Sequence, residues 1–164
     1  MRNLAALLLL STSLFFLPSP SEAQFRWGGH MVHAARSFGG ATGAGLRAGI
    51  DVPVMPLDLV ASGEYFFPDC PQGMSGCGLQ GVTLDANFRM LTPLVRPYGT
   101  GGLAYRRLSP GGEAPAQTES GIALGVGIDA SLGTLRGFGE ARWEFVGAPR
   151  NQLVWRLGVL MGLP

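Results

Sequence analysis

The sequence predicts an all-β protein: an eight-stranded antiparallel up-and-down transmembrane β-barrel that follows an N-terminal signal peptide. Three observations support this fold class. Segment after segment of the chain places apolar residues at every second position, which is the period of a strand with two different faces. Few residues are charged, and the links between the segments alternate between short and long.

The start of the chain has the pattern of a secretory signal. Arg2 precedes the apolar stretch Leu4–Leu17, and the small residues Ser21 and Ala23 precede a predicted cleavage site. A short basic start, an apolar core of about 7–15 residues and a small-x-small site define such signals. The sequence therefore predicts a signal peptide at residues 1–23 and a β-barrel domain at residues 24–164.

Composition argues against a fully water-exposed surface. Charged residues make up 14% of the chain, whereas about a quarter is typical, and a soluble domain of this size needs a well-charged surface. The chain holds 26 glycines and no lysine. Apart from its two histidines, its basic side chains are therefore 12 arginines. The net charge of +1 argues against nucleic acid as a partner.

Each predicted strand is about nine to eleven residues long, which is the length that a tilted strand needs to cross a bilayer. The first, at residues 29–38, is the least regular because its faces are mixed. Even-numbered residues are the apolar ones in 43–52, 82–90 and 121–132, and odd-numbered residues are the apolar ones in 57–67, 135–145 and 153–163. Residues 96–106 form a glycine-rich strand with Tyr98 and Tyr105 near its ends.

The links between these strands sort by length. Short links are predicted at residues 53–56, 91–95 and 133–134, and longer ones at 68–80, 107–120 and 146–151. The first link, 39–42, is shorter than this scheme expects. Outer-membrane barrels have short periplasmic turns, longer outside loops and both termini in the periplasm, and this arrangement puts the long links on the outer side.

Aromatic residues lie at the strand ends beside the long links. They are predicted to form an interfacial girdle, since amphipathic rings favour the headgroup level. The alternative is a small core at one end of a soluble barrel. The girdle residues are Tyr65, Phe66, Phe67, Tyr105, Trp143, Phe145 and Trp155.

The polar face of the strands is predicted to line the lumen, where eight strands leave only enough room for side chains. Charges enclosed there must be paired, and arginine suits this because its planar fork bonds a carboxylate at two points. We therefore expect a plugged lumen of ion pairs, with a narrow ion path as the alternative. The set comprises Arg36, Arg47, Arg89, Arg106, Arg136, Arg142 and Arg156 with Asp51, Asp58, Glu64, Asp85, Asp129, Glu140 and Glu144.

Segments such as GLRAGIDVPVMP, RPYGTGGLAYR and GIALGVGIDASL make the chain resemble the small outer-membrane β-barrel family, the OmpA/OmpX-like eight-stranded group. The resemblance is one of pattern over residues 28–163. It implies a bacterial outer-membrane location, contact with membrane lipid, and assembly by the barrel assembly machinery. Many such proteins end in an aromatic assembly signal, whereas this chain ends Gly-Leu-Pro, with Trp155 as the nearest aromatic residue.

Other chemistry finds little support in the sequence. Cys70 and Cys77 flank a Gly/Pro-rich stretch and are expected to form a disulfide, with free thiols as the alternative. His30 and His33 would lie on opposite faces of a strand near the periplasmic rim, so they are not expected to share a metal ion. No cofactor motif and no nucleophile with a histidine base is recognisable, and Arg142 between Glu140 and Glu144 suggests ion pairing.

The sequence thus predicts a monomeric, non-enzymatic barrel with a structural or surface-contact role, its contacts made through the loops at residues 68–80 and 107–120. Two alternatives stay open. One is a soluble exported barrel that binds a small apolar ligand in the manner of a lipocalin, with its apolar face turned inward. The other is a lipid-modifying enzyme in the same outer-membrane barrel.

Overall fold

The computed structural model describes residues 25–35, 40–52, 55–68, 77–90, 92, 95–109, 115–132, 134–146 and 151–162 of the chain. The predicted signal peptide lies outside the described residues and stays a prediction. Within the part of the chain that is described, no helix is long and apolar enough to cross a membrane.

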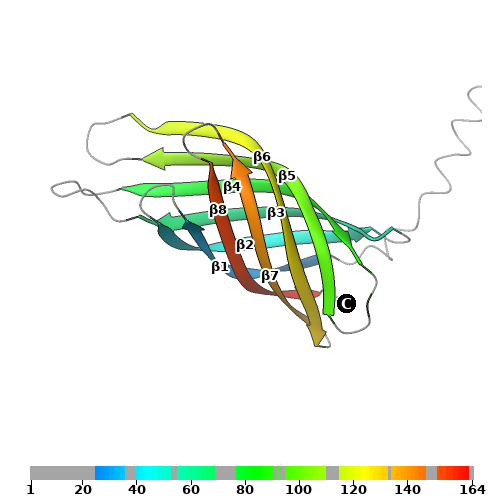
Figure 1. The fold of residues 1–164 in the computed structure, drawn as a ribbon. Coiled ribbons are helices and arrows are strands. Elements are labelled where there is room, and N and C mark those ends of the chain that lie inside the picture. Colours follow the sequence, from blue (N-terminus) through cyan, green and yellow to red (C-terminus); the bar gives the residue numbers. More distant parts are fainter. Residues whose placement is uncertain are drawn as a thin grey trace, which may run out of the picture.

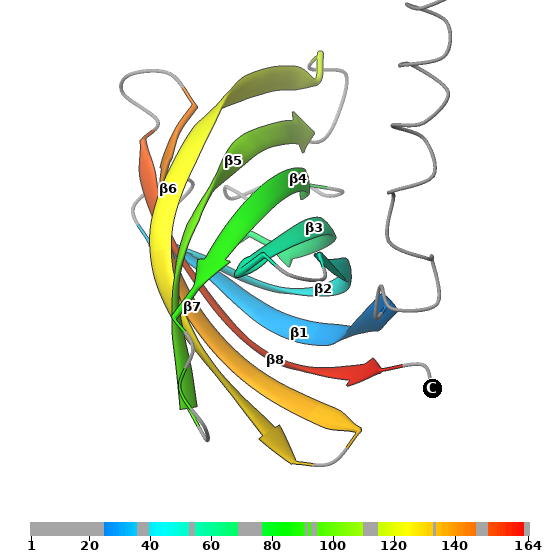
Figure 2. The same ribbon diagram turned by 90° about the vertical axis from the view of Figure 1, so that its right-hand side faces the viewer.

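Eight antiparallel strands form a closed barrel in chain order (Figures 1 and 2). Each strand pairs with the next, and β1 also pairs with β8 to close the barrel. This confirms the predicted fold class. The strands are β1 (Phe25–Ala35), β2 (Ala41–Val52), β3 (Leu57–Phe67), β4 (Gly78–Arg89), β5 (Val95–Ser109), β6 (Gln117–Leu132), β7 (Leu135–Phe145) and β8 (Gln152–Gly162).

The antiparallel order gives the barrel two different ends. We call the end with the links 53–56, 90–94 and 133–134 the turn end; β1 begins there and β8 ends there. The links 36–40, 68–77, 110–116 and 146–151 lie at the opposite end, which we call the loop end. Gly40 stands just before β2 at the loop end with φ = 80°, a left-handed conformation that favours glycine.

The predicted extents of four strands, β1, β4, β5 and β6, were wrong; β4 begins at Gly78 instead of residue 82. β1 begins at Phe25 instead of residue 29, because residues from Arg26 onward have register partners on both β2 and β8. Its predicted end at residue 38 lies outside the described residues. β5 and β6 extend beyond the predicted 96–106 and 121–132, since Leu108 pairs with both Leu79 and Gln117. Much of the predicted loop 107–120 is therefore strand.

The two faces of the strands are arranged as the membrane-barrel hypothesis requires. Large apolar side chains point outward, with Leu46 70% and Leu157 69% exposed, whereas Arg142 and Arg156 are 1% and 2% exposed. A soluble lipocalin-like barrel needs the reverse orientation, so that alternative was wrong. Such an extensive apolar surface on a monomer indicates contact with an apolar environment.

The interior is not uniformly polar. At the loop end, inward-pointing apolar side chains pack together and partly cover Leu108. They come from four strands of the same wall, β1 to β4, and from β8. This apolar cluster consists of Val32, Ala34, Ala41, Phe66, Leu79 and Val154.

Candidate functional site

The middle of the barrel is filled by an ionic network, which we call the central group. It comprises four arginines and four carboxylates from β2, β3, β4, β5, β7 and β8, all of them 5% exposed or less. The members are Arg47, Arg106, Arg142, Arg156, Glu64, Asp85, Glu140 and Glu144.

Arg106 joins two carboxylates on opposite sides of the lumen. Its Nη1 donates to Glu64 Oε2 at 2.5 Å, and its Nε and Nη2 donate to the two carboxylate oxygens of Glu144 at 2.9 and 2.5 Å. The contact with Glu144 is a two-point arginine–carboxylate pair, which is the strongest geometry for such a contact. Strands β3, β5 and β7 are therefore tied together through the interior.

Arg156 makes the equivalent connection from β8. Its Nε donates to Glu64 Oε1 at 2.6 Å and its Nη1 to Glu140 Oε1 at 2.8 Å. Arg47 Nη2 donates to the other oxygen of Glu140 at 2.9 Å, and Arg142 Nη1 donates to Asp85 Oδ2 at 2.7 Å. Because each carboxylate of the central group has at least one guanidinium partner, the burial of its charge is compensated.

Glycines provide the space that these large side chains need. A Cβ added to Gly81 on β4 would overlap the guanidinium of Arg106, and one added to Gly127 on β6 would overlap the ring of Tyr98. The abundance of glycine in the strands thus has a packing cause at these two positions. An inward-facing glycine can mark a place where a large inward-facing side chain, such as arginine, on the neighbouring strand needs room. The alternation of apolar and polar residues alone does not identify such places.

Four interior polar residues were not predicted as part of this network. One is Thr83, whose hydroxyl donates to Asp85 Oδ2 at 2.9 Å. His30 Nε2 lies 3.2 Å from Glu64 Oε1, Tyr98 donates its hydroxyl to Glu140 Oε2 at 3.0 Å, and Gln152 donates to Glu144 Oε2 at 2.9 Å. The prediction that His30 lies near the periplasmic rim was wrong, because its side chain is 6% exposed beside the central group. Tyr98 and Gln152 could have been predicted. Tyr98 lies an even number of positions from Arg106 on the same strand, as Gln152 does from Arg156, so alternation places both side chains on the inner face.

A second ionic group lies at the turn end. Arg89 contacts Asp58 at 2.5 Å, Arg136 contacts Asp51 at 3.4 Å, and Arg96 contacts Asp129 at 2.8 Å. Arg26 also pairs with Asp51. Arg26 and Arg96 were not in the predicted set, the former because β1 begins earlier than expected. The turn-end group is Arg26, Asp51, Asp58, Arg89, Arg96, Asp129 and Arg136. Arg36 of the predicted set lies outside the described residues.

A small cavity separates the two ionic groups. Its volume is about 20 Å³, and Arg47, Asn87, Tyr98 and Phe138 are among its lining residues. That volume accommodates about one water molecule. The Nε and Nη1 atoms of Arg47 and the Oδ1 atom of Asn87 lack protein partners, so they are suited to bind such a water.

Most of the predicted girdle residues point outward near the loop end. Tyr65, Phe67, Tyr105, Phe145 and Trp155 are exposed, and Trp143 is half-buried. The assignment of Phe66 to the girdle was wrong, since the period of two that turns its neighbours outward turns Phe66 inward, where it is 0% exposed.

A second set of outward aromatic side chains lies near the turn end. Phe25 and Trp27 on β1 and Phe88 on β4 are 40%, 45% and 60% exposed. The late predicted start of β1 concealed the first two.

Other predicted features give less chemistry. His33 lies near the loop end, exposed, with its Nδ1 3.1 Å from Thr42 Oγ1, and His30 and His33 do face opposite sides. Among the described residues, no group of three or more His, Cys, Asp or Glu side chains is placed to hold a metal ion. Cys70 lies outside the described residues, so its disulfide with Cys77 stays a prediction.

Comparison with known proteins supports the fold. No protein family and no curated protein matches the sequence. Among solved structures, the N-terminal β-barrel domain of Pseudomonas aeruginosa OprF aligns with a TM-score of 0.62 and 17% identity over 87% of this chain and 100% of that one. Neisserial surface protein A (NspA) aligns with a TM-score of 0.60 and 18% identity over 86% and 96%.

A third solved structure gives a similar match. A major outer membrane protein from Thermus thermophilus aligns with a TM-score of 0.62 and 14% identity over 87% of this chain and 100% of that one. The likeness in each case covers the whole barrel. This chain has the fold of the small eight-stranded outer-membrane β-barrels.

Proposed function

We propose that this chain is an integral protein of a bacterial outer membrane, and that its plugged, salt-bridged barrel serves as a rigid scaffold in the cell envelope. The observation that carries the proposal is the division of the strands into an apolar outer face and an ion-paired inner face. The aromatic residues near both ends match the girdles of membrane barrels. The fold of the solved barrels supports the same location.

The interior supports a closed lumen over a conducting pore. Arg106 and Arg156 reach across the barrel to carboxylates on strands distant in sequence, at 2.5–2.9 Å. An ion that passed between them would have to break these contacts and leave buried charges without partners, at a cost of about 3–5 kcal/mol for each broken pair. The apolar cluster at the loop end adds a second, dry barrier.

The interior also argues against the lipid-modifying alternative. Glu140 and Glu144 have side chains that are 0% exposed and bonded to arginines. A catalytic carboxylate must come within hydrogen-bond reach of its substrate, and these two lie on the opposite side of the barrel wall from lipid. We therefore infer a structural role without catalysis.

The loops remain the candidate contact surfaces of the scaffold. Three of the four links at the loop end are longer than any link at the turn end, and only residues at their ends, such as 115–116, are among the described residues. We propose that the predicted segments 68–80 and 107–120 present a surface ligand site, that the barrel assembly machinery inserts the chain, and that the barrel is a monomer.

Conductance tests the plugged lumen. We expect the purified barrel, refolded in detergent and added to planar bilayers, to give no large stable channels, while a porin under the same conditions does. Insertion is checked in parallel by gel mobility with and without boiling. Large stable channels from the heat-modifiable form would overturn the closed-lumen proposal, and release from membranes without detergent would overturn the membrane location.

A further inference from the structure

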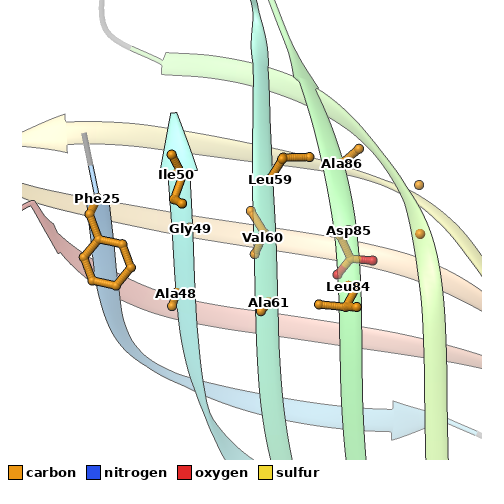
Figure 3. Close-up of a pocket in the computed structure, with 12 residues that line it drawn as sticks. Phe25, Ala48, Gly49, Ile50, Leu59, Val60, Ala61, Leu84, Asp85 and Ala86 are labelled. Atoms are coloured by element: carbon orange, nitrogen blue, oxygen red, sulfur yellow. The ribbon is translucent and has the colours of Figure 1, made fainter. Parts of the chain in front are cut away.

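The cavity between the central group and the turn-end group, which we call the interior cavity, lies behind a thin wall. Gly49 on β2 and Val60 on β3 line it, and Figure 3 shows both, each flanked along its strand by residues of the outer face. The same two residues border an apolar hollow of about 590 Å³ on the outer face. Because a single layer of sheet separates the cavity from apolar surroundings, an uncompensated charge beside it is costly.

Three of the four arginines in the turn-end group are closely matched by carboxylates. The close pairs are Arg26 with Asp51, Arg89 with Asp58 at 2.5 Å, and Arg96 with Asp129 at 2.8 Å. These are all the carboxylates of the group among the described residues. The pairing therefore leaves no carboxylate for the fourth arginine, Arg136.

Arg136 has only long contacts with the same three carboxylates. Its Nη2 lies 3.4 Å from Asp51 Oδ2, and its Nη1 lies 3.8 Å from Oδ2 of both Asp58 and Asp129. Its Nε has no protein partner, although the residue is only 5% exposed. Within the described part of the chain, Arg136 is thus a buried cation without a close counter-ion of its own.

The charge count of the interior agrees with this. The central group holds four arginines and four carboxylates, whereas the turn-end group holds four arginines and three carboxylates. With His30 counted as neutral, the described interior has one positive charge in excess. A buried charge without a partner is strongly unfavourable, so an anion bound beside it would stabilise the folded barrel.

Arg47 supplies further N–H groups at the interior cavity. Its Nη2 donates to Glu140 Oε2 at 2.9 Å, whereas its Nε and Nη1 have no protein partners. The guanidinium carbon lies 4.4 Å from the centre of the Phe138 ring, and this cation–π contact holds one face of the planar group against the ring. Arg47, Arg136 and Phe138 all line the cavity, so a particle bound there lies beside both arginines.

Charge and size together select the ligand. A water molecule can accept hydrogen bonds from the N–H groups, but it leaves the excess charge in place. Phosphate, sulfate and organic carboxylates are too large for a space of about one water molecule. A monatomic anion fits, because chloride is only slightly larger than water. The carboxylates that line the cavity oppose it little, since each is already paired with an arginine.

The interior cavity is accessible from the turn end. The side chains of Arg96 and Asp51 there are 22% and 17% exposed, whereas those of Arg106 and Arg156 in the central group are 2% and 0% exposed. At the loop end, the apolar cluster offers no polar partner to a passing ion. An ion can therefore enter and leave on one side only, in agreement with a closed lumen.

We propose that the interior cavity binds one small monovalent anion, chloride, between Arg47 and Arg136. Arg47 Nε and Nη1 and Arg136 Nε donate hydrogen bonds to the ion. Asn87 also lines the cavity, and its Oδ1 has no protein partner. A half-turn of its amide exchanges the oxygen for the Nδ2 donor and adds a further hydrogen bond. The ion neutralises the excess charge and stabilises the folded barrel.

Unfolding at different chloride concentrations tests the proposal. The full barrel, refolded in lipid vesicles, is titrated with urea at increasing sodium chloride, while sodium gluconate keeps the ionic strength constant. Gluconate is too large for the cavity. One bound ion lowers the unfolding equilibrium constant about tenfold for each tenfold rise in chloride above the dissociation constant. A plot of the logarithm of that constant against the logarithm of the chloride concentration should therefore reach a slope of about −1.

Two variants remove the need for the ion in opposite ways. Asn87→Asp supplies a carboxylate at the cavity, and Arg136→Gln removes the excess cation, so both should give a slope near zero. Asn151→Asp is the matched control and should keep the wild-type slope. It makes the same change of charge just before β8 at the loop end, outside the cavity lining. Gel mobility with and without boiling identifies folded variants, and either cavity variant suffices.

Bromide locates the ion directly. Crystals of the wild type grown in sodium bromide should show an anomalous peak between Arg47 and Arg136, and crystals of Asn87→Asp should lack it. A wild-type slope near zero, or a map without this peak, would overturn the proposal and leave the cavity to water. Equal slopes for the wild type and both cavity variants would also overturn it. None of these results bears on the proposed membrane location, which fractionation tests separately.

Discussion

Arg156 shows how much of the barrel depends on single side chains. It is 2% exposed and contacts Glu64 on β3 and Glu140 on β7, although it is itself on β8. Burial makes such contacts mutually dependent, since a carboxylate that loses its cation keeps the full cost of desolvation. Interior arginines therefore act as cross-braces between strands that are not neighbours in the sheet.

Removal of this brace should be costly. We expect Arg156→Ala to lower the free energy of unfolding by about 3–5 kcal/mol, because it leaves buried carboxylates with too few partners. Arg107→Ala on the outward face of β5, where the side chain is exposed, should change it by no more than about 0.5 kcal/mol. Equilibrium unfolding in urea from lipid vesicles measures both, and equal losses would argue against the bracing role.

Gly81 should be intolerant of even one methyl group. A Cβ at this position overlaps the guanidinium of Arg106, so Gly81→Ala must displace that group from Glu64. We expect a loss of about 1–3 kcal/mol in the free energy of unfolding, from the same urea titration. Gly63→Ala is its control, since a Cβ there meets no atom within 4 Å; a larger loss for the control would contradict the packing argument.

At the scale of the strands, the sequence predicted the barrel well wherever a strand has one apolar and one polar face. β3, β7 and most of β2 and β8 follow their predicted ranges closely. β1 and the β5–β6 hairpin were misjudged because their extents depend on register partners, such as Gly162 for Arg26, which periodicity does not identify.

The ionic site was predictable in part for the same reason. Alternation placed Arg47 and Glu140 on the inner face, but their contact joins β2 to β7. Which arginine meets which carboxylate depends on the stagger of the closed barrel. His30 stayed hidden because the first strand has no clear alternation.

The β5–β6 extension leads to a measurable expectation. Leu108 has register partners on both β4 and β6, so the amides of residues 107 and 108 should exchange with solvent slowly, as strand amides do. Hydrogen exchange of the refolded barrel, with Leu103 in the middle of β5 as the reference, measures this. Exchange at the rate of an unstructured peptide would show that this stretch is a loop, as the sequence first suggested.

At the scale of the whole molecule, the two sets of aromatic residues define a slab. Trp27 lies towards the turn end and Trp155 towards the loop end, both about half exposed on the outer face. Aliphatic residues such as Val126 and Leu46, at 66% and 70% exposure, cover the surface between. This order of surfaces is the one that a bilayer imposes on a barrel.

Fluorescence quenching can locate the slab. In variants that keep only Trp27 or only Trp155, we expect lipids brominated near the headgroup to quench the tryptophan fluorescence more strongly than lipids brominated deep in the acyl chains. A tryptophan-free variant with Val126→Trp should show the opposite order, because Val126 lies midway along the barrel. The same depth profile for all three would contradict the proposed orientation in the bilayer.

Closure of the barrel through β1 and β8 has a consequence for how the protein matures. Arg156 on β8 meets Glu64 on β3, and Arg47 on β2 meets Glu140 on β7, only across the closed barrel, so both carboxylates lack one of their cations until the β1–β8 seam forms. Before that moment the unfinished sheet exposes its carboxylates on an open, wettable side. Sealing the seam and neutralising the interior are then a single event, which makes completion of the barrel abrupt and its reversal slow.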